Sequence, residues 1–202
     1  MRYFGVVIGL LVLVAAGCHQ HPLTDYRPLD QVGMWSSNIE QLKALNVSDD
    51  EVAQVVKLKR AGISDDTCVE LVSSAHAHKR LFTSADPAAN LAGAGFSESQ
   101  ILEMAHADQL DTLSGDAVML KLTGLSDSTV QIVLHRRLSG KPVLGSAEIA
   151  KLKNMGLTEK QILQRIKEGM TDAQAEKEIK ARENARNHSG TGFVRVRGRK
   201  PQ

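Results

Sequence analysis

Residues 60–72 read RAGISDDTCVELV, and the order of residue types in this stretch recurs five more times. Each copy has glycine or asparagine, then an apolar residue, then Ser or Thr, then Asp or Glu. The copies begin at Asn46, Gly62, Gly95, Gly124, Gly156 and Gly169. Glycine and asparagine tolerate the left-handed conformation that ends a helix, and the Ser or Thr hydroxyl can accept from free amides of the next helix. Each copy therefore predicts a corner between two helices.

The residues around each cap support this interpretation. The acidic residue falls in the first helical turn, where the helix dipole favours negative charge. Three residues after the cap, four copies carry the Glu or Gln of a capping box: Glu51, Gln100, Gln161 and Gln174. Thr67 and Thr129 depart from this pattern. Apolar residues also flank every cap at the positions of a hydrophobic staple, and Cys68 occupies one of these positions.

Apolar residues continue at helical spacing on both sides of the corners, so each corner joins a helical hairpin. Further cap candidates lie about ten residues before four corners: Ser36, Ser84, Ser114 and Ser146. The resulting intervals of roughly 29 to 33 residues are typical of stacked helical repeats. The pattern of the tetratricopeptide family is missing.

The sequence therefore predicts an all-α array of about nine or ten short helices over residues 36–187, stacked as a solenoid-like or compact bundle. The expected helices span residues 37–45, 48–60, 64–78, 86–93, 97–107, 115–123, 126–138, 146–154, 158–168 and 171–187.

The chain begins MRYFGVVIGLLVLVAAGCHQ, with one arginine before an apolar run over residues 4–16. The run is shorter than the about 20 residues of a membrane-spanning helix and has the length of a signal-peptide core. It leads into four residues of a cleavage motif: Ala15, Ala16, Gly17 and Cys18. This motif resembles the lipobox of bacterial lipoproteins, although that family prefers leucine at the first position. An ordinary signal peptide or an uncleaved anchor is the alternative.

The lipoprotein resemblance implies removal of residues 1–17, a thioether-linked diacylglycerol on Cys18 and a third acyl chain on its amine. Several acyl chains anchor a protein stably to a membrane. His19 is not the aspartate that commonly retains such proteins in the inner membrane, so the resemblance favours the periplasmic face of the outer membrane. Residues 18–35 contain two prolines and no helical period, and they predict a disordered tether.

Charge is uneven along the remaining chain. Residues 18–175 carry sixteen Lys plus Arg against twenty Asp plus Glu, whereas residues 176–202 carry eight against three. Residues 188–202 predict a basic, disordered tail. Its candidate contacts with anionic lipid, cell-wall polymer or an acidic partner are Arg195, Arg197, Arg199 and Lys200. A solvated tail without a ligand is the alternative.

Among all stretches of the chain, residues 60–72 most resemble an active site, because Cys68 lies beside Asp65 and Asp66. A reactive thiol needs electropositive surroundings, whereas two carboxylates flank this one and its staple position faces a core. We therefore expect Cys68 to pack rather than react. Cys68 is also the only cysteine after Cys18, so the mature chain has no internal disulfide.

Other candidate chemistry is weaker. A hydrolase needs two carboxyl groups across a cleft, but most acidic residues here are explained as first-turn helix residues, and no G-x-S-x-G or P-loop motif appears. His76 and His78 are two apart on an expected helix and so face different ways. His19 and His21 lie on the tether without further ligands. We expect no catalytic residue, no metal site and no cofactor.

Residues 152–184 resemble the helix-turn-helix of response-regulator DNA-binding domains. The lipid anchor places the chain outside the cytoplasm, so we expect no nucleic-acid partner. By analogy of architecture, we expect a membrane-anchored, non-catalytic scaffold or adaptor for an envelope protein, with the oligomeric state open. A lipoprotein that binds cell wall or anionic polymer through the basic tail is the alternative.

Overall fold

The computed structural model describes residues 24–189, and within this range all of the regular secondary structure is helical. Eleven helices follow one another in this part of the chain: α1 Arg27–Gln31, α2 Ser36–Ala44, α3 Asp49–Arg60, α4 Asp65–Ala77, α5 Ala85–Gly93, α6 Glu98–His106, α7 Leu110–Leu122, α8 Asp127–Leu138, α9 Ser146–Asn154, α10 Glu159–Lys167 and α11 Asp172–Ser189. The predicted all-α class is confirmed.

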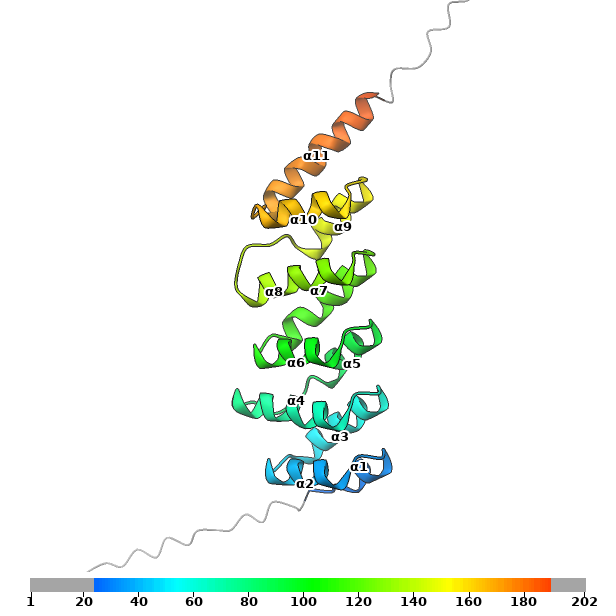
Figure 1. The fold of residues 1–202 in the computed structure, drawn as a ribbon, viewed down its shortest axis with the longest axis vertical. Helices are drawn as coiled ribbons and strands as arrows, with labels where there is room; N and C mark the ends of the chain where they lie inside the picture. The colour runs from blue at the N-terminus through cyan, green and yellow to red at the C-terminus, as the bar shows by residue number, and fades with distance from the viewer. Residues whose placement is uncertain (1–23, 190–202) are drawn as a thin grey trace, which may run out of the picture.

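The helices form two layers. The odd-numbered helices pack against one another in order from α1 to α11, while α2 packs on α4, α4 on α6, and α8 on α10. Figure 1 shows the resulting stack, with successive hairpins side by side along one long axis and α11 at the far end. The array is a solenoid.

The corners have the geometry that their sequence predicts. Gly62 has a φ of +84° and Asn46 has a φ of +55°, both in the left-handed region. After α3, the Ile63 amide donates to the Leu58 carbonyl at 3.1 Å and the Gly62 amide donates to the Lys59 carbonyl at 3.0 Å. These two bonds form a Schellman motif, which satisfies carbonyl groups at the end of the helix.

All four capping boxes are present. The backbone amide of Ser48 donates to the Glu51 carboxylate at 2.9 Å, while the Glu51 amide donates back to the Ser48 hydroxyl at 3.3 Å. The boxes at α6, α10 and α11 have the same reciprocal bonds. The staple residues lie in one continuous core that includes Val47, Val52, Ile63, Cys68, Phe96, Ile101, Leu125, Val130, Leu157 and Ile162.

About two thirds of the residues predicted as a tether over residues 18–35, namely residues 24–35, belong to the fold instead. From residue 24 onward the chain belongs to the fold, because Arg27–Gln31 form α1, which packs on α3. Leu29 and Met34 are buried in the core. A helix of five residues is too short to display a helical period, so the pattern of the sequence does not reveal it.

The start of α7 also differs from the prediction. The helix begins at Leu110 rather than at residue 115, and Ser114, expected as its cap, is buried inside it. The Ser114 position resembles a cap because Gly115 follows it, but a glycine inside a helix costs only about 1 kcal/mol relative to alanine.

Of the other three predicted caps, two are wrong and one has the right position. Ser36 and Ser146 are the first residues of α2 and α9, whose N-caps are Trp35 and Gly145. Ser84 is at the N-cap of α5, but its side chain makes no cap hydrogen bond. The starts of α2 and α9 depend on acceptors from neighbouring hairpins, described below.

Candidate functional site

The site residues expected at the two ends of the chain lie outside the described residues. This holds for the lipobox residues, which are Ala15, Ala16, Gly17 and Cys18, and for the tail cations, which are Arg195, Arg197, Arg199 and Lys200. Their predicted roles therefore stay predictions. Among residues 24–189, no helix is long and apolar enough to cross a membrane.

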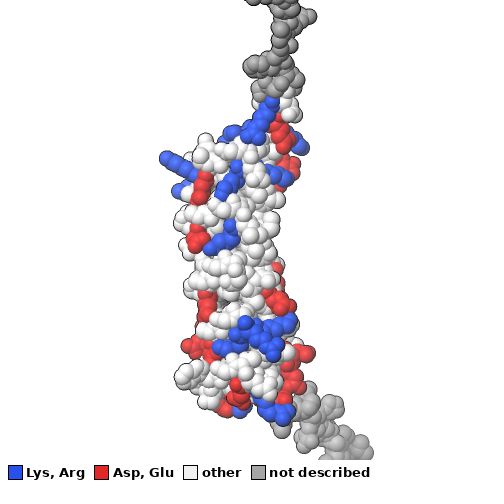
Figure 2. Space-filling model, turned by 90° about the vertical axis from the view of Figure 1, so that its right-hand side faces the viewer, with Lys and Arg blue, Asp and Glu red and all other residues white. Residues whose placement is uncertain are grey.

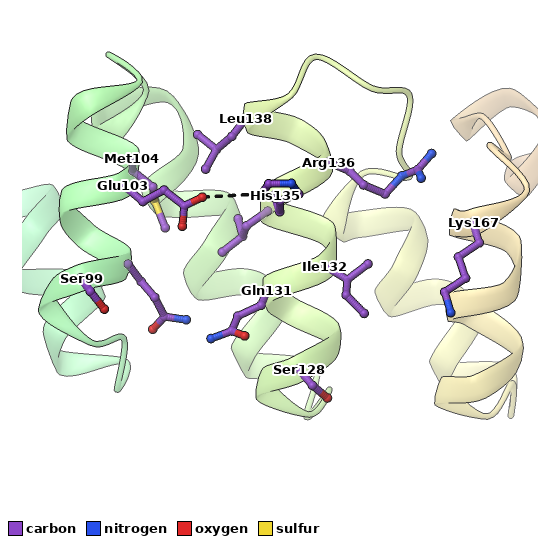
Figure 3. A pocket seen from close by; sticks show the side chains of 12 residues that line it. Ser99, Glu103, Met104, Ser128, Gln131, Ile132, His135, Arg136, Leu138 and Lys167 are labelled. Atoms are coloured by element: carbon purple, nitrogen blue, oxygen red, sulfur yellow. Dashed lines mark ion pairs between the residues drawn. The ribbon is translucent and has the colours of Figure 1, made fainter.

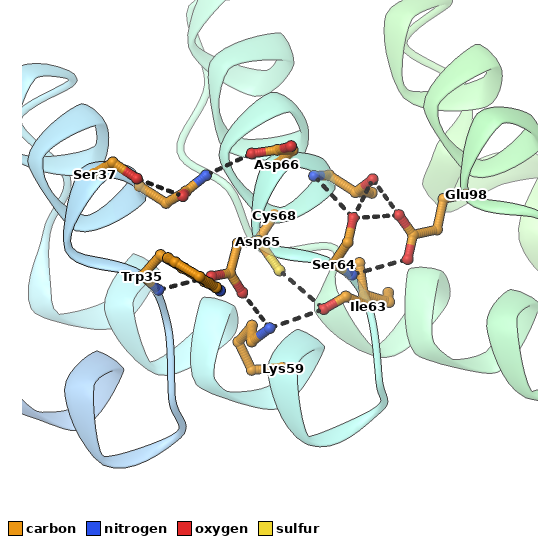
Figure 4. A network of polar contacts seen from close by, with 11 residues as sticks. Trp35, Ser37, Lys59, Ile63, Ser64, Asp65, Asp66, Cys68 and Glu98 are labelled. Carbon is orange, nitrogen blue, oxygen red and sulfur yellow. Dashed lines mark hydrogen bonds and ion pairs between the residues drawn. The ribbon is translucent and has the colours of Figure 1, made fainter.

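Cys68 is packed, as expected from its staple position. Its side chain is fully buried, and its thiol lies 4.0 Å from the Ile63 carbonyl oxygen (Figure 4). Burial raises the pKa of Cys68 to about 12. Because the thiolate is the nucleophilic form, this cysteine is poorly suited to chemistry.

The two aspartates beside Cys68 bind other parts of the protein. Asp65 pairs with Lys59 and accepts from the Trp35 amide at 2.7 Å, and Asp66 accepts from the Asn38 side-chain amide at 2.8 Å (Figure 4). Burial raises the pKa of Asp65, but the hydrogen bonds from Lys59 and Trp35 outweigh burial and hold the pKa below its ordinary value. Both carboxylates therefore serve the joint between α2 and α4.

His76 and His78 also serve joints between helices. The His76 ring lies 2.7 Å from the buried Glu51 carboxylate, which also accepts from the Phe82 amide at 2.9 Å. The His78 ring lies 3.1 Å from the His106 carbonyl oxygen, on the neighbouring helix α6. The two rings bind different partners. Within residues 24–189, no three His, Cys, Asp or Glu residues are grouped to hold a metal ion.

A repeated hydrogen bond links neighbouring helices of one layer, and we name it a cross-repeat cap. In it, an acidic residue at the first position of a helix accepts from the N-cap amide of the preceding helix in the same layer. Glu98 of α6 accepts from the Ser64 amide of α4 at 2.8 Å and from the Thr67 hydroxyl at 2.5 Å. It also accepts from the Ser64 hydroxyl.

The same contact recurs at other helix starts. Glu159 of α10 accepts from the Ser126 amide of α8 at 3.2 Å, and Asp172 of α11 accepts from the Gly145 amide of α9 at 2.7 Å. Asp65 serves Trp35 of α2 in this way. Trp35 and Gly145 lack a side-chain cap hydrogen bond, so the neighbouring acid replaces the serines that the sequence suggested.

Cross-repeat caps explain why Thr67 and Thr129 depart from the capping box. A threonine at this position is too short to reach back to the N-cap amide, and at both corners a glutamate of the next even-numbered helix accepts that amide instead. Burial raises the pKa of Glu98, but hydrogen bonds from Ser64 and Thr67 outweigh it and hold the pKa below the ordinary glutamate value. For Glu159, hydrogen bonds from Ser126 and Thr129 lower the pKa despite some burial.

The even layer lacks a cross-repeat cap at one junction, between α6 and α8. The Ser97 amide of α6 is already bound by its own Gln100 at 2.8 Å. Asp127, the first residue of α8, pairs instead with Lys121 at 2.5 Å. Between α6 and α8 the described residues form one ion pair, His135 with Glu103 at 3.7 Å, and both side chains are more than half exposed.

An open groove lies at this junction, with a volume of about 760 Å³. We name it the α8 groove, and its walls come from α6, α8 and α10. It is lined by Ser99, Gln100, Glu103, Met104, Ser128, Gln131, Ile132, Leu134, His135, Arg136, Leu138 and Lys167. Figure 3 shows that Gln131, His135 and Leu138 point toward α6, whereas Ile132 and Arg136 lie on the side of α8 that faces α10.

The groove has an apolar floor and a polar rim. Met104 and Leu134 are almost fully buried at its base, and Ile132 and Leu138 are partly exposed along its walls. The rim carries glutamine, serine and charged side chains. An apolar floor with a few polar groups above it is typical of a binding groove.

A second groove, of about 550 Å³, lies between α5 and α7. Its lining contains no charged residue, and two large side chains beside it are exposed, Met119 and Leu122. Figure 2 shows the right-hand side of the array as drawn in Figure 1. On this face the charged side chains gather toward the ends of the array and are few in its middle. This groove offers shape but no charged group to select a partner.

The comparisons with known proteins do not assign this site. No protein-family model, no curated protein and no solved structure matches the chain. The candidate site therefore rests on its geometry alone. Sequence reasoning missed it, because three other copies also carry Glu or Gln at the position of Gln100, and only the stacking order of the hairpins sets this corner between those of Thr67 and Thr129.

Proposed function

We propose that this protein is a membrane-anchored lipoprotein whose helical array acts as a non-catalytic adaptor, and that a partner protein of the cell envelope docks in the α8 groove. The observation that carries the proposal is the groove itself, which interrupts an otherwise connected layer of helices. The lipobox supplies the anchor, as the sequence predicts. A solenoid exposes an extended surface, which repeat proteins commonly use for binding.

The side chains that could in principle act in catalysis are occupied in the fold, which supports a binding role. Asp65 and Glu98 are engaged in cross-repeat caps, Glu51 holds a corner, and Cys68 is buried in the core. In the α8 groove the single carboxylate, Glu103, faces His135 at the exposed rim. Docking of a partner side chain requires only the apolar floor and hydrogen-bonding rim that the groove provides.

The anchor is tested by a Cys18→Ser variant of the full chain. We expect this variant to appear in the soluble fraction after cell lysis and to incorporate no labelled palmitate, because the acylated thiol is lost. The unaltered chain should pellet with membranes. Membrane retention of Cys18→Ser would contradict the lipoprotein assignment.

The docking surface is tested by a photoreactive amino acid placed in the membrane-anchored chain in living cells. At Gln131, in the groove, it should cross-link to a discrete partner protein. At Ala53, an exposed position on α3, it should not. The added change Leu138→Glu should suppress the cross-link from position 131. Equal cross-linking from both positions, or none from either, would overturn the adaptor assignment.

A further inference from the structure

The chemistry of the α8 groove specifies its occupant more closely than the adaptor function alone. The α8 groove has two parts, one on each side of α8, and we call each part a furrow. We propose that the groove binds an acidic amphipathic helix of the partner protein. The apolar side chains of that helix would lie in the furrow between α6 and α8, and a carboxylate would lie beside Arg136 and Lys167. This inference rests on the adaptor function proposed above. Three features of the groove support it, namely its floor, its walls and its charge.

The floor requires apolar side chains from the occupant. Met104 and Leu134 form its base, and Leu138 and Ile132 expose part of their side chains on either side of α8. Burial of apolar surface contributes about 25 cal/mol for each Å² removed from water. The furrow between α6 and α8 is where cross-repeat capping is missing, so it can accept side chains from outside.

The walls favour a helix over an extended peptide. All walls of the groove are helices, whose backbone groups are bonded within each helix, so there is no strand edge to which an extended chain can add. A bound segment must satisfy its own backbone amides and carbonyls, and a helix does so. A helix laid along α8 would place side chains in the two furrows that flank α8, as in known helix-in-groove complexes.

The charge favours an acidic partner. Arg136 and Lys167 line the groove, and neither forms an ion pair within residues 24–189. Arg136 donates one hydrogen bond to the Pro142 carbonyl at 3.2 Å, and its Nε atom is buried without a partner. The single carboxylate of the lining, Glu103, faces His135. A partner carboxylate near the two cations would therefore restore charge balance, and such complementarity selects partners and speeds association.

The same charge argues against the chain's own tail as the occupant. Residues 190–202 contain four Lys plus Arg and no acidic residue, so they would add positive charge beside Arg136 and Lys167. A second copy of this chain could also fill the groove. The experiment below separates it from an acidic partner.

The test uses the full mature chain, residues 18–202, with Cys18→Ser to keep it in solution. The probes are two fluorescein-labelled 18-residue helical peptides with an identical leucine stripe, one with glutamate and one with lysine at the polar positions. Fluorescence anisotropy at low salt should show at least about tenfold tighter binding of the glutamate peptide. That factor corresponds to about 1.4 kcal/mol.

Charge reversal makes the test specific to the groove. The double variant Arg136→Glu and Lys167→Glu should bind the lysine peptide more tightly than the glutamate peptide. A matched double variant outside the groove, Lys141→Glu and Lys151→Glu, should keep the original preference, because both lysines are exposed elsewhere. Circular dichroism would verify that both variants are folded.

Three results would overturn the inference. One is equal binding or no binding of the two peptides, and another is a preference that charge reversal leaves unchanged. The third is a dimer in light scattering that Leu138→Glu converts to a monomer, since a second copy would then fill the groove. If Gln131 still cross-links to a partner in cells while peptide selectivity fails, the adaptor function stands and only the acidic occupant is rejected. If both fail, the adaptor function is rejected too.

Discussion

The junction between α4 and α6 is closed, whereas the next junction in the same layer, between α6 and α8, is open. At the closed junction Glu98 binds three groups of the α4 corner, and the far ends of the helices meet through His78 and the His106 carbonyl. At the open junction the equivalent residue, Asp127, turns to Lys121 within its own hairpin. The difference shows that the repeat has two kinds of corner.

One kind of corner is self-contained and the other depends on its neighbour. Where the third residue after the cap is Glu or Gln, the corner satisfies its own amide, as Gln100 does for Ser97. Where that residue is threonine, as at Thr67, the next helix must supply the acceptor. A self-contained corner releases the next helix from this contact, and in the even layer that release coincides with the groove.

The largest expected effect is a difference in stability between two variants. Each variant lacks the acidic first residue of one helix, α6 at the closed junction or α8 at the open one. Glu98→Ala should lower the free energy of unfolding by about 2–3 kcal/mol, because it removes three hydrogen bonds worth about 0.5–1.5 kcal/mol each. Asp127→Ala should cost less than about 1 kcal/mol, since it removes one first-turn charge and one ion pair whose carboxylate is exposed. Urea denaturation followed by circular dichroism measures both. Equal losses would mean that cross-repeat caps do not distinguish the junctions.

The next effect comes from converting the open junction into a closed one. The double variant Gln100→Thr and Asp127→Glu gives α6 the corner type of α4 and gives α8 the glutamate of α6. We expect a gain of about 1 kcal/mol from the new cross-repeat cap and weaker binding of the glutamate peptide. Each single change is the control, because neither completes the cap. A double variant no more stable than the sum of its single changes would refute this explanation of the groove.

A smaller effect is expected on how the stability of the folded chain depends on pH. The pKa values of Glu98 and Glu159 are lowered in the folded chain from 4.5, so their contribution is complete above the unfolded pKa and is lost as pH falls through the folded pKa. The double variant Glu98→Gln and Glu159→Gln should therefore lose less stability between about pH 7 and pH 3 than the unaltered chain. Thermal unfolding across this range measures the difference. Parallel curves would show that these carboxylates do not contribute in their ionised form.

The corners were predictable from sequence because their determinants lie within a few residues of each other. Gly62, Ser64 and Glu51 each act on groups three to five residues away, so a single short stretch reveals the role. The burial of Cys68 followed from its alignment with Val52 and Val130 at the same position of other copies. Local order along the chain thus accounts for the fold class and for the rejection of the apparent active site.

The groove and the cross-repeat caps were not predictable in the same way. Glu98 and Ser64 are 34 residues apart, and Asp65 and Trp35 are 30 apart. Their pairing depends on the order in which hairpins stack, which a local pattern does not contain. The threonine at position 67 was visible as an exception to the capping box, but its meaning required the neighbouring helix to be in place.

The smallest effect is expected for Cys68, which lies in α4 next to the corner that Glu98 binds at the closed junction. Cys68→Val should change the free energy of unfolding by less than about 1 kcal/mol, because valine has a similar volume and fills the same position at Val52 and Val130. A maleimide reagent at neutral pH should label the native chain far more slowly than the urea-unfolded chain, since the thiol is buried and its pKa is raised to about 12. An Ala53→Cys variant, with an exposed thiol, is the labelling control. Rapid labelling of native Cys68 would show that the α4 corner opens readily, and the closed junction would then differ little from the open one.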